Sequence, residues 1–187
     1  MKQLLCLFTI GSVLVAGSGF LYGGEKAPQK IVDYANSKLI KWGSDSIIVN
    51  AVKTENAKGK SLDQIKELDK KWMATPGVDP FMKSLMDSPC GKHLQGLQKS
   101  APFLAEIFVM DNQGANVCMS DKTSDFWQGD EPKFVESFKS GNGAVHISDV
   151  SFDKSTQAYL VQASVPVKDG GKVIGALTIG INVDKFK

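Results

Sequence analysis

Residues 157–184, QAYLVQASVPVKDGGKVIGALTIGINVD, decide the fold class of this chain. Two apolar segments flank the turn Asp169-Gly170-Gly171, which is a β-hairpin signal. In the second segment the side chains alternate between two faces. One face is mainly large and apolar. The other is small and partly polar, and consists of Ile174, Ala176, Thr178, Gly180 and Asn182. We expect the first face to pack against a helix and the second to lie behind a ligand or a tightly packed loop.

Three more strands are expected upstream of this hairpin. Residues 103–120 have the pattern of strand, turn and strand, with a tight connection at Asp111–Gly114. Residues 143–153 supply the third. Five strands joined mostly by short turns must form an antiparallel sheet, because parallel pairing needs long crossover connections.

The first half of the chain has the spacing of amphipathic helices. Residues 28–56 are expected to form one long helix, or two helices with a kink at Gly43-Ser44-Asp45. A second helix begins with a capping box at Ser61. A third helical segment covers residues 80–99 and is weakened at Ser88-Pro89. Helices followed by an antiparallel sheet predict an α+β fold.

The N-terminal residues 1–24 have the composition of a secretory signal peptide. Leu4–Val15 is apolar, and Ala16–Gly19 supplies the small residues that signal peptidase needs near its cut. The alternative is an uncleaved membrane anchor over Leu4–Gly24, whose uncharged length is close to the roughly 20 residues of a spanning helix. Either way, residues 25–187 are expected to form one domain that is periplasmic or otherwise exported.

Charge and cysteine content exclude several classes of function. The net charge of +2 comes from lysines scattered among acidic residues, so no nucleic-acid partner is expected. The sequence has no CxxC or CxxCH motif, which argues against a redox or metal site and against covalent haem, and no cofactor is expected. Outside the signal segment the cysteines are Cys90 and Cys118. In an oxidising compartment they form a disulfide or remain two small buried side chains.

The connection between the second and third strands is about 20 residues long, and such connections in compact domains are usually functional or partly helical. Its last part, residues 131–140, suits a short helix. In the preceding stretch, Phe126 and Trp127 offer flat apolar walls, and Asp125 and Asp130 are suited to an ammonium group. Hydrogen-bonding groups are supplied by Ser120, Thr123 and Gln128. The alternative is that the aromatic residues pin the loop to the sheet while the carboxylates lie in water.

Enzyme function is not expected. The only histidines are His93 and His146, and HExxH, GxSxG and glycine-rich phosphate motifs are absent. An acid–base enzyme remains an alternative only if Asp125 and Asp130 converge in a cleft. Tyr159 suits either the core or a pocket, since a buried tyrosine needs a partner for its hydroxyl.

Four motifs together carry a resemblance to a known family. They are NAVKTENAKGKSLDQIKELDKKW at 50–72, AEIFVMDNQGANV at 105–117, SDKTSDFWQGDEPKF at 120–134 and SVPVKDGGKVIGALTIGINVD at 164–184. In this order the chain resembles the Cache superfamily of extracytoplasmic sensor domains, or PDC sensors, in their single-domain form. The resemblance implies a PAS-like five-stranded antiparallel sheet with a long N-terminal helix on one face and a small-molecule pocket on the other.

The resemblance also implies roles for individual residues. Trp127 and Phe126 become pocket walls, Asp125 and Asp130 polar contacts, and Ser120 and Tyr159 secondary contacts. The implied ligand is a small metabolite, namely an amino acid, an organic acid or an amine. Amino-acid-binding members carry an arginine just before the aromatic pair, where this chain has Lys122.

The resemblance places such domains in signal transduction and chemotaxis. The implied partner is therefore a membrane receptor or sensor kinase, to which this protein reports ligand state. A ligand-free protein-interaction module, including a homodimer, is the alternative.

Overall fold

The computed structural model describes residues 24–154 and 156–187. Within them the strands form one antiparallel sheet in the order β2-β1-β6-β5-β3, and β4 also pairs with β5. The strand bounds are β1 Leu104–Met110, β2 Asn116–Met119, β3 His146–Ile147, β4 Ser151–Asp153, β5 Ala158–Asp169 and β6 Lys172–Asn182. The predicted α+β class and antiparallel sheet are confirmed, and β5 and β6 form the predicted hairpin.

The expected third strand is divided into the short strands β3 and β4, so the described residues contain six strands rather than five. The reason lies in the backbone between them. The Val150 N–H donates to the Glu25 carbonyl at 2.7 Å, and the Val150 carbonyl accepts from Gly24 N–H at 3.0 Å. The segment between β3 and β4 therefore bonds to the start of the described chain.

The predicted long helix is interrupted. It consists of α1 (Gln29–Ser37), the 3-10 helix η1 (Leu39–Ser44) and α2 (Ser46–Asn56), so the kink expected at Gly43-Ser44-Asp45 is present. Asp45 caps α2 by accepting from Ile47 N–H at 2.8 Å. A β-carbon on Gly43 would lie 2.1 Å from the Pro166 carbonyl oxygen, so this glycine allows η1 to approach β5 closely.

The later helices begin and end close to the predicted positions. Their bounds are α3 Leu62–Ala74, α4 Pro80–Asp87, α5 Pro89–Lys99 and α6 Pro132–Phe138. The capping box at the start of α3 is confirmed: Ser61 Oγ accepts from Gln64 N–H at 3.3 Å, and Gln64 Oε1 accepts from Ser61 N–H at 2.9 Å. Ser88 separates α4 from α5 and caps α5 through its hydroxyl.

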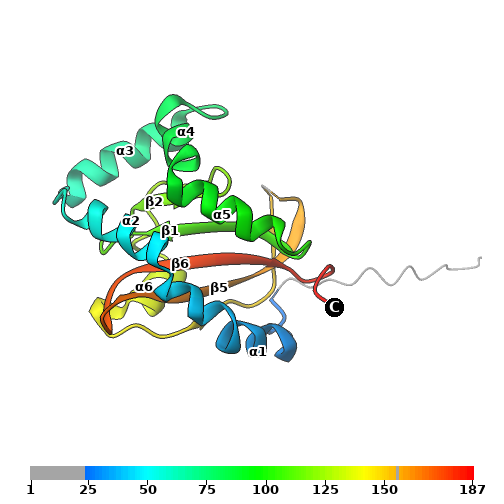
Figure 1. Cartoon of the computed structure of the whole chain (residues 1–187). Coiled ribbons are helices and arrows are strands. Elements are labelled where there is room, and N and C mark those ends of the chain that lie inside the picture. Colours follow the sequence, from blue (N-terminus) through cyan, green and yellow to red (C-terminus); the bar gives the residue numbers. More distant parts are fainter. Residues whose placement is uncertain (1–23, 155) are drawn as a thin grey trace, which may run out of the picture.

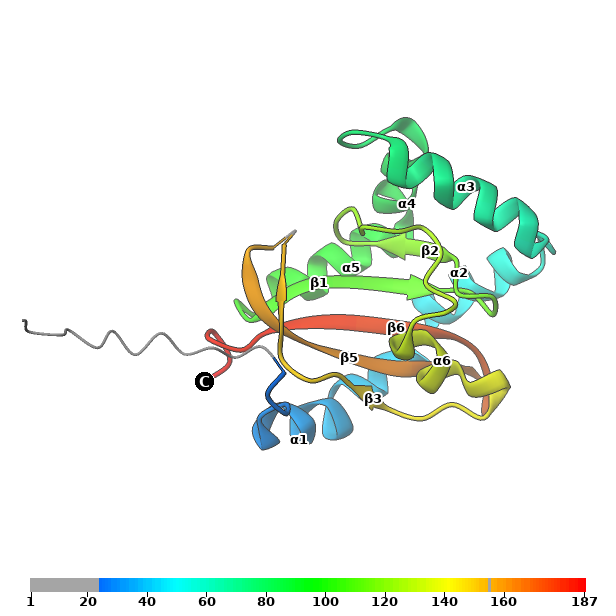
Figure 2. The same ribbon diagram turned by 180° about the vertical axis from the view of Figure 1, so that it is seen from behind.

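The two faces of the sheet are covered by different layers. Figure 1 shows α1, α2 and α5 across one face, and Figure 2, from behind, shows α6 and the β2–α6 loop on the other. The first face carries the apolar side chains of β6, including Leu177, Ile179 and Ile181, in one core with α1, α2 and α5. The second core joins Phe108 and Ala176 of the opposite face to α3, α4 and the loop.

A disulfide joins Cys90 at the start of α5 to Cys118 of β2, at a sequence separation of 28 and a Cα–Cα distance of 5.9 Å. It ties the helical layer to the outermost strand of the sheet. None of the helices within the described residues has the length and apolar character to span a bilayer. The segment predicted as signal or anchor, residues 4–24, lies almost wholly outside the described residues.

Candidate functional site

The β2–α6 loop is held in place by helix α3. The carboxylate of Asp69 accepts from the backbone N–H groups of Phe126 at 2.8 Å and Trp127 at 3.0 Å. The indole N–H of Trp72 donates to the Thr123 carbonyl at 2.9 Å. Asp69 and Trp72 are three residues apart, so one helix face supplies both anchors.

The loop is also bonded within itself. The Asp125 carbonyl oxygen accepts from the Thr123 hydroxyl at 2.7 Å, the Gln128 amide at 2.8 Å and the Asn116 amide at 3.1 Å. Asn116, on β2, also donates to the Thr123 hydroxyl at 2.7 Å. The loop therefore forms a fixed wall over the sheet.

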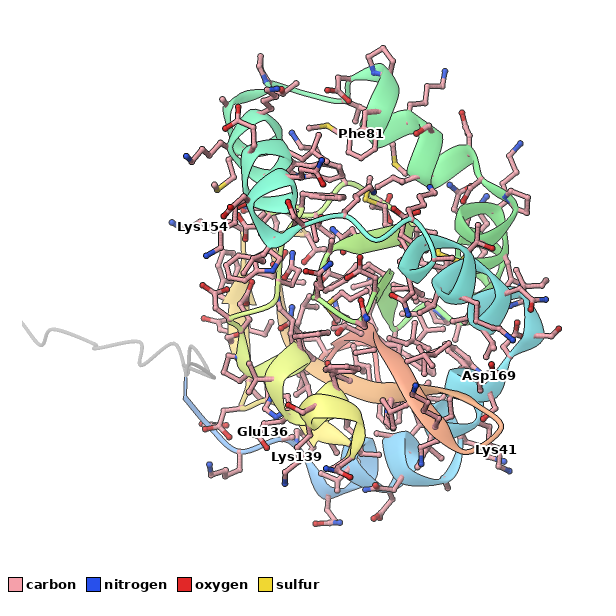
Figure 3. All side chains as sticks on the ribbon, turned by 90° about the vertical axis from the view of Figure 1, so that its left-hand side faces the viewer. Lys41, Phe81, Glu136, Lys139, Lys154 and Asp169 are labelled. Atoms are coloured by element: carbon pink, nitrogen blue, oxygen red, sulfur yellow. A yellow bond between two sulfur atoms is a disulfide. The ribbon has the colours of Figure 1, made fainter. Side chains whose placement is uncertain are left out.

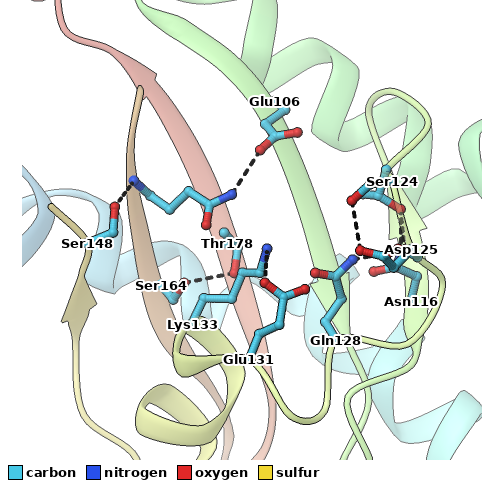
Figure 4. A network of polar contacts seen from close by, with 12 residues as sticks. Glu106, Asn116, Ser124, Asp125, Gln128, Glu131, Lys133, Ser148, Ser164 and Thr178 are labelled. Carbon is cyan, nitrogen blue, oxygen red and sulfur yellow. Dashed lines mark hydrogen bonds and ion pairs between the residues drawn. The ribbon is translucent and has the colours of Figure 1, made fainter. Parts of the chain in front are cut away.

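A cavity of about 270 Å³ lies between this wall and side chains of β1 and β5 in the sheet. Its lining comes from β1, β5, the loop, α6 and the β4–β5 turn, and consists of Glu106, Phe108, Thr123, Ser124, Gln128, Lys133, Asp153, Lys154 and Gln162. The volume is near the lower end of the range for small-ligand sites, about 300–1,000 Å³. Figure 4 shows Glu106, Gln128 and Lys133 extending from separate elements toward a common space, and in Figure 3 Lys154 lies at the edge of the molecule.

The small residues of β6 make room for this cavity. Gly180 lies between Glu106 of β1 and Gln162 of β5 in the sheet register. A β-carbon on Gly180 would lie 2.6 Å from Glu106 Cγ, so only glycine leaves space for the Glu106 side chain in this position. The expectation that the small face of β6 lies behind a ligand site or a packed loop agrees with this arrangement.

Glu106 is a partly buried acidic residue in an otherwise apolar strand, β1. Burial raises the pKa of its carboxyl, and the Asp153 carboxylate raises it further, while a hydrogen bond from Gln162 and the charge of Lys133 lower it. The Gln162 amide lies 3.3 Å from Glu106 Oε1. The Lys133 ammonium is paired with Glu131 at 3.0 Å and lies 5.5 Å from the centre of the Phe108 ring.

The raised pKa of Glu106 predicts a pH dependence of stability. Between the ordinary glutamate pKa and the raised one, the folded protein binds more protons than the unfolded chain, so stability falls as pH rises through this window. We expect Glu106→Gln to reduce this slope, measured by urea unfolding at a series of pH values. The Glu106→Gln variant should retain part of the slope of stability against pH, because burial also raises the pKa of Asp111. An unchanged slope in Glu106→Gln would contradict the prediction.

The predicted aromatic residues contact groups other than those that line the cavity. Phe126 is fully buried, and its ring packs 5.5 Å from those of Trp72 and Phe81. The Trp127 indole donates to the Gln113 carbonyl at 2.8 Å and lies under the Lys66 ammonium at 4.6 Å. Neither residue belongs to the cavity lining, and Phe126 instead pins the loop to α3 and α4.

The four predicted polar residues lie apart from one another. Asp125 is half-buried and accepts from the Ser124 hydroxyl at 2.9 Å, whereas Asp130 is exposed. Ser120 is buried and accepts from Ile107 N–H at 2.9 Å, so it supports β1. Tyr159 is half-buried and packs against Phe152, with ring centroids 5.4 Å apart. These four side chains do not line the cavity either.

Three residues that line the cavity, Glu106, Asp153 and Gln162, were not predicted from the sequence. The signal for Glu106 was present, because an acidic residue in an otherwise apolar strand shares a face with Phe108. Asp153 and Gln162 lie on β4 and β5, and the strand order β1-β6-β5 of the sheet brings them near Glu106 of β1. In the part of the chain that the structure describes, histidine, cysteine and acidic side chains form no group suited to a metal ion.

No protein-family model matches the sequence, and no curated protein matches it. Several solved structures are similar to it. The sensor domain of the V. cholerae histidine kinase DctB has 12% sequence identity and a TM-score of 0.48, over 84% of this chain and 55% of that chain. The sensory domain of the Campylobacter jejuni chemoreceptor Tlp3 has 16% identity and a TM-score of 0.43, over 84% and 66% of the two chains.

A third similar structure is the ligand-binding domain of Tlp3 in complex with L-valine, with 18% identity and a TM-score of 0.41, over 84% and 65% of the two chains. This chain therefore spans 55–66% of these three chains. These three structures are sensor or ligand-binding domains of a histidine kinase and a chemoreceptor. At such low identities the function must be inferred from the residues of this chain.

Proposed function

We propose that this protein is an exported sensor domain that binds a small metabolite in the cavity between the sheet and the β2–α6 loop, without catalysing a reaction. One observation carries the proposal. A cavity of about 270 Å³ is lined by convergent charged and amide groups around the Phe108 ring, and helix α3 holds its wall in place. A pocket of this size with a few placed polar groups is how small-ligand sites are built.

Within this proposal, ligand contacts come from Glu106, Gln128, Lys133, Asp153 and Gln162, with Phe108 as the apolar surface. Of the six residues predicted as ligand contacts, Phe126, Trp127 and Ser120 act indirectly, by fixing the loop and β1 beside the cavity. The ligand belongs to the predicted classes of amino acid, organic acid or amine.

The proposal includes export and a signalling partner. A disulfide between Cys90 and Cys118 suits an oxidising compartment such as the periplasm. Residues 1–24 would direct export as a signal peptide, or would hold the domain at the membrane as an anchor. The partner would be a membrane receptor or a sensor kinase.

The test is a thermal-shift screen of the exported domain with amino acids, organic acids and amines, followed by calorimetric titration. A ligand that binds only the folded state stabilises it by mass action, by about 2.7 kcal/mol at a concentration 100 times Kd, and therefore raises Tm. We expect Gln162→Ala to weaken the affinity for any such ligand at least tenfold. Gln29→Ala, an exposed residue of α1 on the opposite side of the sheet, is the matched control and should leave affinity unchanged.

A screen in which no compound raises Tm, or a ligand whose affinity is insensitive to Gln162→Ala, would count against this site. The mostly apolar groove of about 570 Å³ between α2 and the α4–α5 corner would then favour a protein-interaction module.

A further inference from the structure

The cavity is lined by two lysines, Lys133 and Lys154, and two acidic residues, Glu106 and Asp153. Lys133 is already neutralised by Glu131 at 3.0 Å, and Lys154 is exposed at the rim. Glu106 accepts a hydrogen bond from neutral Gln162, and no lysine or histidine among the described residues lies within ion-pair distance of it. Asp153 lines the same cavity and raises the pKa of Glu106, so two carboxylates face this space.

An unpartnered acceptor provides a second, independent observation. Gln128 is 1% exposed, and its side-chain N–H group donates to the Asp125 carbonyl, which fixes the orientation of the amide. Its Oε1 is buried and accepts no hydrogen bond within the described residues. In Figure 4 this oxygen faces the side of Glu131 and Lys133, away from Asp125. A buried carbonyl oxygen of this kind is satisfied only by a donor, and carboxylate ligands bring none.

The basic residues of the chain also disfavour a carboxylate ligand. All 22 basic residues are lysines, so no guanidinium group is present to hold a carboxylate with two parallel hydrogen bonds. A ligand carboxylate would have to displace Glu131 from Lys133 and would meet Glu106 and Asp153 in the same small space.

We infer that the cavity selects a short organic cation, a primary amine or diamine, whose ammonium group lies between Glu106 and Asp153 and donates to Gln128 Oε1. This inference rests on the proposed function and adds the ligand class. The carbon chain of the amine packs on the Phe108 ring, and the ammonium neutralises the Glu106 carboxylate, which has no basic partner within ion-pair distance among the described residues.

Four probes of similar length separate the ligand classes: putrescine, butylamine, butyrate and γ-aminobutyrate. We expect putrescine and butylamine to raise Tm and to titrate calorimetrically, and butyrate to do neither. Glu106→Gln should weaken amine binding at least tenfold without unfolding the protein. Glu67→Gln, the same change at an exposed position of α3, should leave amine binding unchanged.

The outcomes distinguish this inference from the proposed function. If butyrate or γ-aminobutyrate binds in a Gln162-dependent manner and the amines do not, the cavity is a ligand site but the cation assignment is overturned. If none of the probes binds and the wider screen also yields no ligand, both proposals are overturned.

Proton release supplies a second readout. The charged groups that face Glu106 are Asp153 of β4, Lys133 of α6 and Asp121 after β2. An ammonium bound beside Glu106 favours its ionised form, so at a pH below the raised pKa of this carboxyl, amine binding should release protons and affinity should increase with pH. Calorimetry in two buffers of different ionisation enthalpy counts these protons. Amine binding without proton release, or with the same release in Glu106→Gln, would contradict the assignment.

Discussion

Replacement of both Cys90 and Cys118 by alanine is expected to lower the free energy of unfolding by about 3–4 kcal/mol. The disulfide closes a loop whose ends are 28 residues apart in sequence, and a cross-link of that span removes about this much conformational free energy from the unfolded chain. Both residues are almost fully buried, so alanine leaves only a small additional void. Urea unfolding under oxidising conditions measures the loss.

Reductant provides the control. It should destabilise the wild-type domain by a similar amount and leave the double-alanine variant unaffected. Equal stability of the wild type with and without reductant, or an intact mass unchanged by reduction, would show that the two thiols are not bonded in solution.

Trp72→Ala is expected to be equally damaging, with a loss of about 3–5 kcal/mol, which is typical of a buried aromatic residue replaced by alanine. Trp72 is 2% exposed and packs against Phe81 and Phe126. Its indole also donates to the Thr123 carbonyl, so the substitution releases one anchor of the β2–α6 loop. Urea unfolding measures the loss in stability, and titration with an identified ligand measures the effect on the cavity.

Trp72→Phe separates packing from anchoring. The phenyl ring retains part of the apolar contact but leaves the Thr123 carbonyl without its donor, at a cost of about 1–3 kcal/mol for an unsatisfied buried group. We expect a smaller loss of stability than for Trp72→Ala and a clear loss of ligand affinity, because Thr123 lines the cavity. If Trp72→Ala costs less than about 1 kcal/mol, the core around Phe126 is not packed as described.

Those features of the fold that depend on neighbouring residues could be predicted. The capping box at Ser61, the break before Pro89 and the restart of the helix at the Asp45 cap all depend on side chains within a few residues of the backbone groups that they bond or restrict. The β5–β6 hairpin depends on its two-glycine turn and on alternation along each strand. The division of the third strand could not be predicted, since it depends on Gly24 and Glu25, more than a hundred residues earlier in the chain.

The candidate site shows the same limit. The sequence by itself determined that a long loop after the second strand carries aromatic and acidic residues, and that one face of β6 is small enough to leave space beside it. Only the tertiary structure decided which side of the loop faces that space. Asp69 and Trp72 of α3 bond to loop residues more than 50 positions later in the sequence. These bonds hold Phe126 in the core and leave Thr123 and Gln128 at the cavity. Composition specifies which groups a loop contains, whereas packing against distant elements selects those that a ligand can contact.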